Sequence, residues 1–432
     1  MPQALVRTLL EEQRLRLARP LVRRDVRFPS LPGKIDVAIG MRRSGKTCAL
    51  LQVMQDLLAA GAPEESLFHL SLDDDRLGSL DASAAAALVD EFYAIYPENH
   101  RRTCHLFLDE VHVVDGWARW VRRLHDTKKA KLYLTGSSAK LLSREIATEL
   151  RGRSLATTIW PFSFREWLRA QGQEPERPLL GRPSRDLLAQ RLVEYLTAGG
   201  FPEVVGRNAP ERVAVLQNYV DVVVFRDVVE RHQITNLPAA RYLTRLLLHS
   251  LGRPFSINKA FNDLRSQGRR ISKDTLYAYQ AYFEDAFLCF AVGRHGASAR
   301  KSEIAPRKVF AVDPGLATAF LPAGTTDLGR RFENLVYLDL RREGTEIGYH
   351  VTADGREVDF VATWPDGRSE ILQVSWDADD KATRAREEEA LRVAERELGL
   401  PGILLTPDAY LERVFGIRPS APRRATRGSL RR

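Results

Sequence analysis

Between residues 34 and 170, short apolar runs alternate with stretches in which apolar residues recur at helical spacing. The apolar runs are IDVAIG, SLFHLSLDD, HLFLDE and AKLYLTGSS, and each ends in glycine or in polar residues. Strands of this buried kind, joined by helices, are typical of a parallel sheet, which binds its ligand at the carboxyl ends of the strands. The pattern predicts an α/β domain over residues 34–170.

The residues on either side of this domain divide into further regions. Residues 1–33 predict a basic helix followed by a linker, because RFPSLPGK contains two prolines. Residues 171–238 are predicted to be mainly helical, and residues 305–417 return to mixed α/β with strands KVFAVD, EVDFVA, EILQVS and GILLT. The tail, residues 418–432, holds six arginines and no acidic residue, so we expect it to be disordered.

Residues 239–304 carry the helical pattern that is easiest to interpret. A helix ends at a glycine, and a second helix begins after Ser272, which is a suitable N-cap. Leu276, Tyr279 and Phe283 fall on one face of this second helix. A strand, FLCFAV, and a basic turn, GRHGASARK, follow. This order of elements predicts a winged helix.

Composition and charge restrict the class of protein. A chain of 432 residues is too long for one ordinary core, which favours two or three domains. Cys48, Cys104 and Cys289 form no CxxC pair, which favours a reducing cytoplasm and no zinc site. No apolar run approaches the roughly 18 residues of a membrane helix. The tail supplies +6 of the formal net charge of +9, and it either binds nucleic acid or keeps the chain soluble.

The segment GMRRSGKT matches G-x-x-x-x-G-K-[ST] at every fixed position, after an apolar run and before a helical pattern. Gly40 and Gly45 let the backbone N–H groups wrap phosphates, Lys46 reaches the β- and γ-phosphates, and the Thr47 hydroxyl binds Mg²⁺. The cofactors predicted are therefore ATP and Mg²⁺. The predicted nucleotide-binding set is Gly40, Arg43, Ser44, Gly45, Lys46, Thr47 and Cys48. Arg42 and Arg43 add cations beside the phosphates or are solvated.

A second motif, HLFLDE, ends an apolar run with two adjacent acids. Asp109 is predicted to hold Mg²⁺ with Thr47, and Glu110 to polarise the attacking water. The next apolar run ends in YLTGSS, where Thr135, Ser137 and Ser138 stand at the position of a γ-phosphate sensor.

Two arginines follow in LRGRS. Arg151 and Arg153 are candidates for neutralising charge in the transition state, either within one subunit or from a neighbouring one. Action from a neighbour would favour a ring or a dimer, so the sequence leaves the oligomeric state open.

At this point the chain resembles a known family. The segments GMRRSGKT, LFLDEVHVVDGWARWVRRLHD, PFSFREWL, YLTAGGFPEVV, VDPGLA and GRRFENLVYLDLRR are similar to those of prokaryotic AAA-type ATPases that carry an uncharacterised C-terminal domain. The resemblance spans nearly all of residues 34–410. It implies an AAA-like P-loop NTPase core, a helical and winged-helix middle domain, and a nuclease-like C-terminal α/β domain.

If the second helix after Ser272 contacts DNA, the cations around it are placed for the phosphate backbone. The candidates are Arg269, Arg270, Lys273, Arg294, Arg300 and Lys301. Lys273 and Gln280 are also candidates for contacts at the helix itself. The alternative is a winged helix that serves for packing or transmits the nucleotide state.

The hairpin REVDFVATWPDGRSEILQVSWD predicts a degenerate nuclease-like site. Glu357 and Asp359 are two apart on a strand and share a face, and a preceding helix carries Glu333. This arrangement resembles the PD-(D/E)XK nucleases, but QVS, beginning at Gln373, replaces their E-x-K. A glutamine carbonyl is a weak ligand for a hard dication, and serine cannot supply the charge of the lysine. A lysine such as Lys381 could take its place, but we expect a site without cleavage activity.

These features predict a cytoplasmic, Mg²⁺-dependent ATPase that couples ATP binding and hydrolysis to DNA binding or remodelling, without a membrane partner. Two alternatives remain open from the sequence. One is an ATP-dependent switch that acts through protein partners, and the other is an ATP-gated DNA nuclease.

Overall fold

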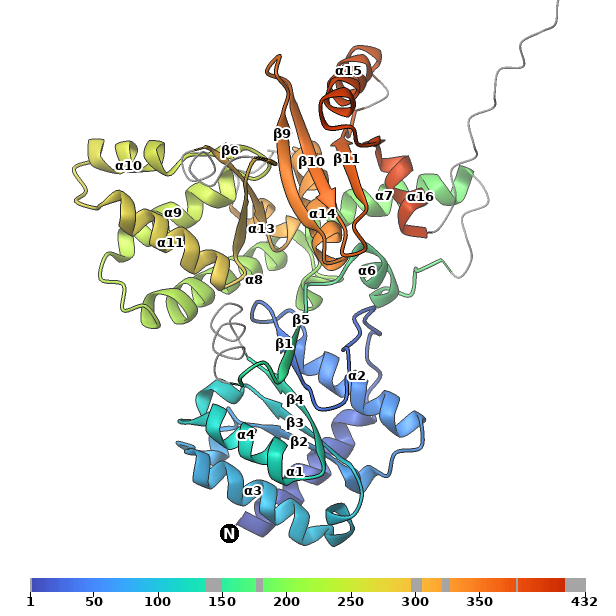
Figure 1. The fold of residues 1–432 in the computed structure, drawn as a ribbon, viewed down its shortest axis with the longest axis vertical. Coiled ribbons are helices and arrows are strands. Elements are labelled where there is room, and N and C mark those ends of the chain that lie inside the picture. Colours follow the sequence, from blue (N-terminus) through green and yellow to red (C-terminus); the bar gives the residue numbers. More distant parts are fainter. Residues whose placement is uncertain are drawn as a thin grey trace, which may run out of the picture.

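A sheet of five parallel strands forms the centre of the first lobe (Figure 1). The computed structural model describes residues 2–136, 150–175, 182–296, 305–320, 327–377 and 380–415. The strand order is β2-β3-β4-β1-β5, which confirms the predicted parallel sheet. The strands are β1 (Ile35–Ile39), β2 (Leu67–Ser71), β3 (Cys104–Asp109), β4 (Ala130–Thr135) and β5 (Ser154–Thr158).

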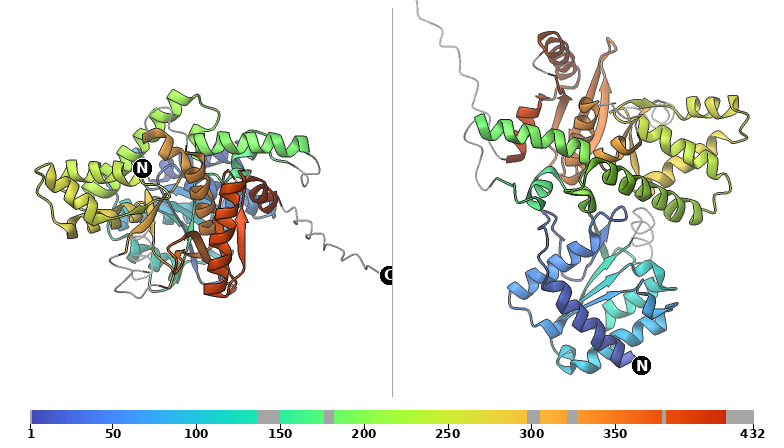
Figure 2. Two further views of the ribbon diagram at one scale, coloured as in Figure 1. Left: turned by 90° about the horizontal axis from the view of Figure 1, so that it is seen from above. Right: turned by 180° about the vertical axis from the view of Figure 1, so that it is seen from behind.

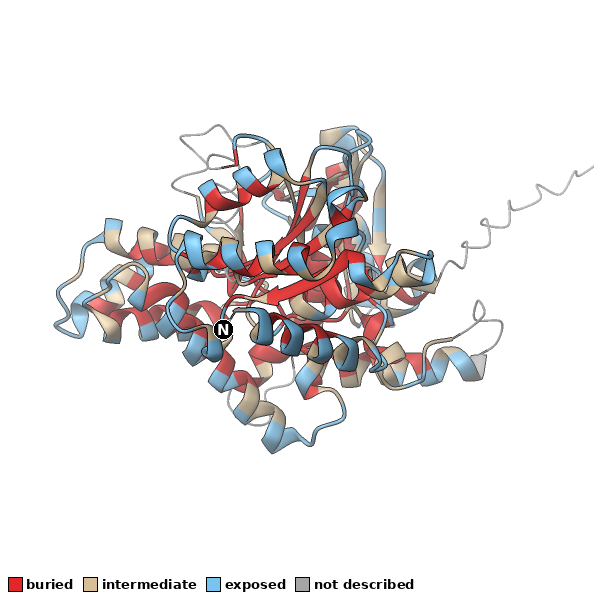
Figure 3. Ribbon diagram, turned by 90° about the horizontal axis from the view of Figure 1, so that it is seen from below, coloured by how far each residue is buried: buried red, intermediate tan, exposed pale blue. Residues whose placement is uncertain are grey.

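Both faces of this sheet are covered by helices, because successive strand residues point to opposite faces. Phe107 and Tyr133 stack in register on the face that packs against α2 (Lys46–Ala59). Their neighbours Leu106 and Leu132 face the other way, toward the core formed with the remaining helices of the lobe. Those helices are α1 (Pro2–Leu17), α3 (Ala82–Ile95) and α4 (Trp117–Thr127). Figure 3 shows the buried central strands beneath helices whose outer faces are exposed.

The N-terminal helix α1 is part of the first lobe rather than a separate basic arm. Val6, Leu9 and Leu10 are buried in its core. The side chain of Gln13 donates to the carbonyl of Leu67 at 3.1 Å and accepts from the N–H of His69 at 2.7 Å, so it satisfies the edge strand β2. Seen from behind, α1 lies across the lower lobe (Figure 2). The prediction of a helix was correct, but charge alone did not reveal its buried face.

The second lobe begins with helices that lead from the first sheet. These are α6 (Phe164–Ala170), α7 (Arg182–Ala198), α8 (Ala209–Val222), the π-helix η6 (Val223–Glu230) and α13 (Pro314–Phe320). The described residues also contain short 3₁₀ turns: η1 (Glu64–Ser66), η2 (Asp75–Leu77), η3 (Pro97–His100) and η4 (Val111–Val113) in the first lobe, and η5 (Pro202–Val204) in the second.

A small antiparallel sheet and three helices follow, on the left of the upper lobe in Figure 1. The elements are α9 (Leu237–His249), β6 (Pro254–Phe255), α10 (Ile257–Ser266), α11 (Lys273–Asp285), β7 (Cys289–Val292) and β8 (Arg307–Ala311). Ser272 caps α11 by accepting from the N–H of Thr275, as predicted. The strand order is β6-β8-β7. KVFAVD, predicted within the C-terminal domain, therefore pairs instead with the strands at residues 254–255 and 289–292.

The last unit is a sheet of order β12-β11-β10-β9, in which only β11 and β12 are parallel. Its strands are β9 (Glu346–Val351), β10 (Glu357–Thr363), β11 (Ser369–Val374) and β12 (Gly402–Leu405). Its helices are α14 (Leu328–Arg342), α15 (Lys381–Leu398) and α16 (Pro407–Phe415). The predicted hairpin is thus formed by β10 and β11. The tail 418–432 lies outside the described residues.

The two lobes are joined by the segment after β5. The carbonyl of Phe162 accepts from the hydroxyl of Tyr195 at 2.7 Å, and the N–H of Phe162 donates to the carbonyl of Gly200 at 2.7 Å. The buried carboxylate of Asp313 accepts from the N–H groups of Gly200 and Gly315 at 2.5 and 2.8 Å. These contacts anchor the segment after β5 to the end of α7, and the end of α7 to the start of α13. Among the described residues, no helix has the length and apolar character needed to cross a bilayer.

Candidate active site

The loop between β1 and α2 has the backbone geometry that the glycine motif predicts. Gly40 has φ 145° and Gly45 has φ 99°, values that side chains disfavour. A Cβ atom at Gly40 would also lie 2.4 Å from the carbonyl oxygen of Ile159. The loop therefore wraps tightly and ends at the N-terminus of α2, where backbone N–H groups and the helix dipole favour phosphate.

Lys46 is buried inside this loop. Its ammonium donates to the carbonyls of Gly40 and Met41 at 3.2 and 3.3 Å. Burial lowers the pKa of Lys46, while Glu110 and Asp109 oppose that change. Among the described residues no carboxylate forms an ion pair with this ammonium, so a phosphate oxygen can replace its weak carbonyl contacts.

Asp109 and Thr47 form a pair of oxygen ligands at the edge of the sheet. The Thr47 hydroxyl donates to Asp109 Oδ2 at 2.6 Å, and the Thr135 hydroxyl donates to Oδ1. His69 Nε2 lies 3.5 Å from Oδ2. Burial opposes ionisation of Asp109, but His69, Thr135 and Thr47 outweigh it and lower its pKa to about 2. A permanent carboxylate beside a hydroxyl fits Mg²⁺, which takes few protein ligands and completes its shell with phosphate oxygens and water.

Glu110 follows Asp109 directly, and the backbone of Glu110 is strained. Its φ of 53° lies in the left-handed region, and its N–H donates to the Thr135 hydroxyl at 2.8 Å. Burial raises the pKa of Glu110, although Lys46 opposes the rise. His112 Nδ1 lies 3.2 Å from Glu110 Oε2, and burial lowers the pKa of His112 to about 4, so this imidazole is neutral. Glu110 is therefore a carboxylate of increased basicity that points to the same site.

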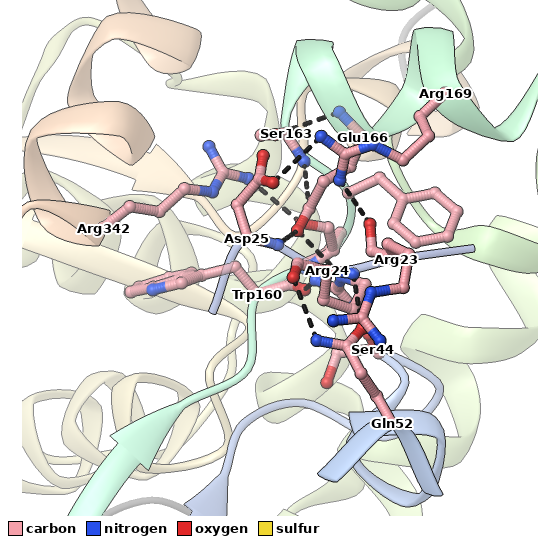
Figure 4. Close-up of polar contacts among 12 residues, drawn as sticks. Arg23, Arg24, Asp25, Ser44, Gln52, Trp160, Ser163, Glu166, Arg169 and Arg342 are labelled. Carbon is pink, nitrogen blue, oxygen red and sulfur yellow. Dashed lines mark hydrogen bonds and ion pairs between the residues drawn. The ribbon is translucent and has the colours of Figure 1, made fainter. Parts of the chain in front are cut away.

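The opposite side of the loop is held by an arginine from the predicted linker, which sequence reasoning missed. Arg24 donates from Nε to Glu166 at 3.0 Å, and from its terminal nitrogens to the carbonyls of Ser44 and Trp160 at 3.0 and 2.5 Å (Figure 4). Only 4% of its side chain is exposed. Burial opposes ionisation of Glu166, but Arg24 and backbone N–H groups outweigh it and lower its pKa. The buried pair joins the N-terminal segment, the phosphate-binding loop and α6.

A cavity of about 700 Å³ lies beside the loop, between the two lobes. One side is formed by Arg42, Lys46, Thr47 and Glu110. The other side comes from the N-terminal segment and from the second lobe: Pro20, Leu21, Val22, Phe162, Pro202, Glu203, Asn218, Tyr219 and Val222. Charged groups gather at the loop end, whereas apolar side chains predominate elsewhere, so the cavity suits a ligand with a phosphate chain and a flat apolar group.

Most of the predicted phosphate-site residues come together here. Ser44 is buried in the loop, and Arg43 and Cys48 are exposed beside it. Ser137 and Ser138 lie outside the described residues. Thr135, expected near a γ-phosphate, donates to Asp109 and accepts from the N–H of Glu110, and its role as a sensor stays a prediction.

Arg151 and Arg153 lie at the end of the sheet away from the phosphate-binding loop. They precede β5, whose first residue pairs with Ile35 at the start of β1, and Arg153 lies 3.4 Å from Asp126 at the end of α4. The phosphate-binding loop follows the other end of β1, a strand length of roughly 15 Å away. The prediction that either arginine neutralises charge within the same chain is therefore wrong.

The second predicted cluster contains a lysine that the sequence did not reveal. Glu333 on α14 and Glu357 and Asp359 on β10 all surround Lys308, whose ammonium lies 2.9, 2.7 and 2.8 Å from their oxygens. Only 1% of the Lys308 side chain is exposed. Burial and the charge of Asp359 raise the pKa of Glu333 to about 8.

The neighbours of this cluster are also polar side chains with partners. Gln373 donates to Glu387 at 2.6 Å and accepts from the N–H of Asp359 at 3.2 Å. Lys381, the lysine suggested by the sequence, is instead exposed at the start of α15. Within the described part of the chain, no group of three or more histidine, cysteine, aspartate or glutamate side chains is arranged to hold a metal ion. The ammonium of Lys308 occupies the point on which the carboxylates converge.

The predicted DNA-contact residues are partly exposed around α11. Arg269, Arg270 and Lys273 are exposed, and the Lys273 ammonium lies 5.4 Å from the ring centre of Phe261. Arg294 is exposed but donates to the carbonyl of Val351, so it is used in packing. Gln280, predicted to be accessible, is buried and donates to Glu284 at 3.3 Å. Arg300 and Lys301 lie outside the described residues.

Comparison with known proteins agrees with the phosphate-site geometry. A family model described as an AAA domain matches residues 33–168, and a domain of unknown function, DUF8612, matches residues 189–327. The uncharacterized protein MJ1544 of Methanocaldococcus jannaschii is 32% identical over 399 residues, which cover 91% of this chain and 86% of that protein. The chain belongs to this family of AAA-domain proteins. The predicted AAA-type core is thereby confirmed.

Two further similarities were found. An uncharacterized protein of Haemophilus influenzae is 29% identical over 342 residues, covering 79% of this chain and 81% of that protein. Among solved structures, the Walker-type ATPase PABY2304 of Pyrococcus abyssi covers 70% of this chain and 98% of its own, with 15% identity and a TM-score of 0.43.

Proposed function

We propose that the protein is a Mg²⁺-dependent ATPase whose nucleotide state controls contact between its second lobe and DNA. The observation that carries the ATPase proposal is the convergence of Lys46, Thr47, Asp109 and Glu110 at one end of the cavity. These residues supply the groups that hydrolysis needs: a basic side chain for phosphate, a hydroxyl beside a carboxylate whose pKa is lowered to about 2, and a carboxylate whose pKa is raised by burial.

The residues divide the work of phosphoryl transfer. The loop N–H groups and Lys46 bind the phosphate chain and neutralise charge that develops on it. Mg²⁺, when bound by Thr47 and Asp109, would withdraw charge from the phosphate oxygens. Glu110 accepts a hydrogen bond from the attacking water and takes its proton, which is favoured because burial raises its pKa.

The position of the cavity supports coupling between nucleotide and the second lobe. Tyr219 and Val222 on α8 line it opposite the loop, so occupancy changes the contacts between the lobes. The α9-to-β8 unit of that lobe has the order helix, strand, helix, helix, strand, strand, which supports the proposal of a winged helix. Arg269, Arg270 and Lys273 would then contact phosphates at the start of α11, with little dependence on base sequence.

The C-terminal unit is proposed to be a nuclease-like fold without cleavage activity. Its support is positional: a helix carries Glu333, one strand carries Glu357 and Asp359, and the next carries Gln373. Lys308 holds the three carboxylates together, which leaves no oxygen cluster open for a divalent ion.

ATP turnover measured with and without duplex, single-stranded and branched DNA, at two salt concentrations, tests these proposals. We expect DNA to raise turnover, and the effect to fall at the higher salt concentration because phosphate contacts release counterions. Turnover that ignores every DNA would instead support a switch acting through protein partners. Loss of intact plasmid with Mg²⁺ or Mn²⁺ would contradict the inactive nuclease-like unit.

A further inference from the structure

An ion pair connects the phosphate-binding loop to the second lobe. Arg42 Nε lies 3.0 Å from both carboxylate oxygens of Asp227, a residue 185 positions away. The Arg42 side chain is 37% exposed, whereas that of Asp227 is 5% exposed. Arg42 belongs to the loop between Gly40 and Gly45 and lines the cavity, but Asp227 does not line it. Asp227 therefore contacts the loop through Arg42, although its charge also acts on the nearby ammonium of Lys46.

The geometry of this pair leaves the phosphate-binding edge of the guanidinium available. Asp227 is contacted by Nε, and within the described residues neither terminal nitrogen of Arg42 donates a hydrogen bond, so both can bind a second acceptor. A guanidinium presents its N–H groups in a rigid fork that matches phosphate oxygens. Fixing Nε orients this fork and reduces the side-chain entropy that a flexible arginine would lose on binding.

Asp227 also lies in an unusual stretch of backbone. It is part of η6 (Val223–Glu230), a π-helix that continues directly from α8, and π-helical turns occur frequently at functional sites. Val223, Val228 and Val229 of the same segment are buried in the core of the second lobe. Just after it, the ring of His232 stacks on Tyr282 of α11 at 3.6 Å. The segment that carries Asp227 therefore packs close to α11.

We propose that Asp227 is a positioning residue that holds Arg42 for the γ-phosphate, so that η6 senses whether a nucleoside triphosphate or diphosphate is bound. This inference rests on the proposed ATPase function and adds to it that η6 responds to the presence of the γ-phosphate. A diphosphate lacks the acceptor that Arg42 is placed to reach. The triphosphate instead ties Arg42, and through it Asp227, to the phosphate chain.

Binding of ATP and ADP, with Mg²⁺, to the full-length Glu110→Gln variant measures this directly, because that variant removes the proposed base and limits hydrolysis. We expect Asp227→Asn to lower the preference for ATP over ADP by about tenfold, the size of one charge-assisted hydrogen bond, with ADP affinity changed less than about twofold. Arg42→Gln should cause the same loss, and the double variant no more than either. Asp221→Asn, the same change at an exposed position of α8 that does not line the cavity, is the matched control and should leave the preference unchanged.

Hydrogen exchange of residues 223–230 separates positioning from a purely structural role. ATP should slow exchange there more than ADP does, and Asp227→Asn should remove this difference while leaving exchange without nucleotide similar. An unchanged ATP preference in Asp227→Asn and Arg42→Gln, with ADP binding intact, overturns this inference alone. Failure of the parent variant to bind either nucleotide overturns the proposed ATPase function, and the inference with it.

Discussion

Replacement of Lys308 by methionine tests the interpretation of the C-terminal cluster. Methionine keeps most of the volume of the side chain but removes the ammonium that lies 2.7 to 2.9 Å from three carboxylates. Removing one partner of a buried ion pair typically costs about 3–5 kcal/mol, because the remaining charges lose their compensation. We therefore expect Lys308→Met to destabilise the C-terminal unit by this amount at pH 8.

The cost should depend on pH in a direction fixed by Glu333. The raised pKa of about 8 means that the folded state holds a proton on Glu333 that the unfolded chain releases above about 4.5. The folded state thus loses stability as pH rises from about 4.5 to 8. Without the Lys308 cation the pKa of Glu333 should rise further, so the penalty in Lys308→Met should shrink as pH falls toward 5.

Hydrogen exchange in peptides from β8, β10 and α14 measures the loss where it occurs, since a chain with two lobes need not unfold in one step. Lys381→Met, at an exposed position, is the matched control and should change local stability by less than about 0.5 kcal/mol. Manganese should recover part of the lost protection in Lys308→Met only, because the vacated carboxylates then suit a hard cation. Equal protection by manganese in the Lys381→Met chain would refute the view that Lys308 closes this site.

Three further predictions follow from the active site and the proposed DNA surface. ATP turnover should fall as pH drops through the raised pKa of Glu110, because a protonated carboxyl cannot accept the proton of water, and a pH–rate profile checks this. The Glu110→Gln variant should retain ATP binding but lose about 10²–10⁴-fold in turnover. Arg24→Ala should cost about 3–5 kcal/mol of local stability, measured by hydrogen exchange in peptides around Glu166, because Glu166 loses its buried partner. It should also weaken ATP binding, since the Ser44 carbonyl loses a donor; unchanged local stability would contradict the role of this network. Alanine at Arg269, Arg270 and Lys273 should weaken binding of unrelated duplexes alike and reduce the salt dependence; loss for one sequence only would argue against backbone contact.

The sequence predicted the parts of the site that depend on neighbouring residues. The loop before α2 and the acids after β3 are local motifs, because the chemistry needs glycines, a lysine and carboxylates at fixed short spacings. The N-cap at Ser272 and the apolar face of α11 are likewise local, and the structure confirms both.

The missed contacts join residues that are far apart along the chain. Arg24 pairs with Glu166 across 142 positions, and Arg42 with Asp227 across 185. Lys308 reaches Asp359 across 51 positions, from a strand that pairs in a different sheet. Charged residues are abundant, so one sequence does not reveal which of them become buried partners. The apolar positions of α1 gave a weak signal for burial, because five charged residues are interspersed among its seven apolar ones.

Whether the chain binds magnesium–ATP at the phosphate-binding loop can be measured by calorimetry of the purified protein. We expect saturable heat of binding at one site per chain, and its loss in Lys46→Ala, because Lys46 is the buried lysine of this loop. Absence of binding heat in the natural chain, or the same binding in Lys46→Ala, would contradict it.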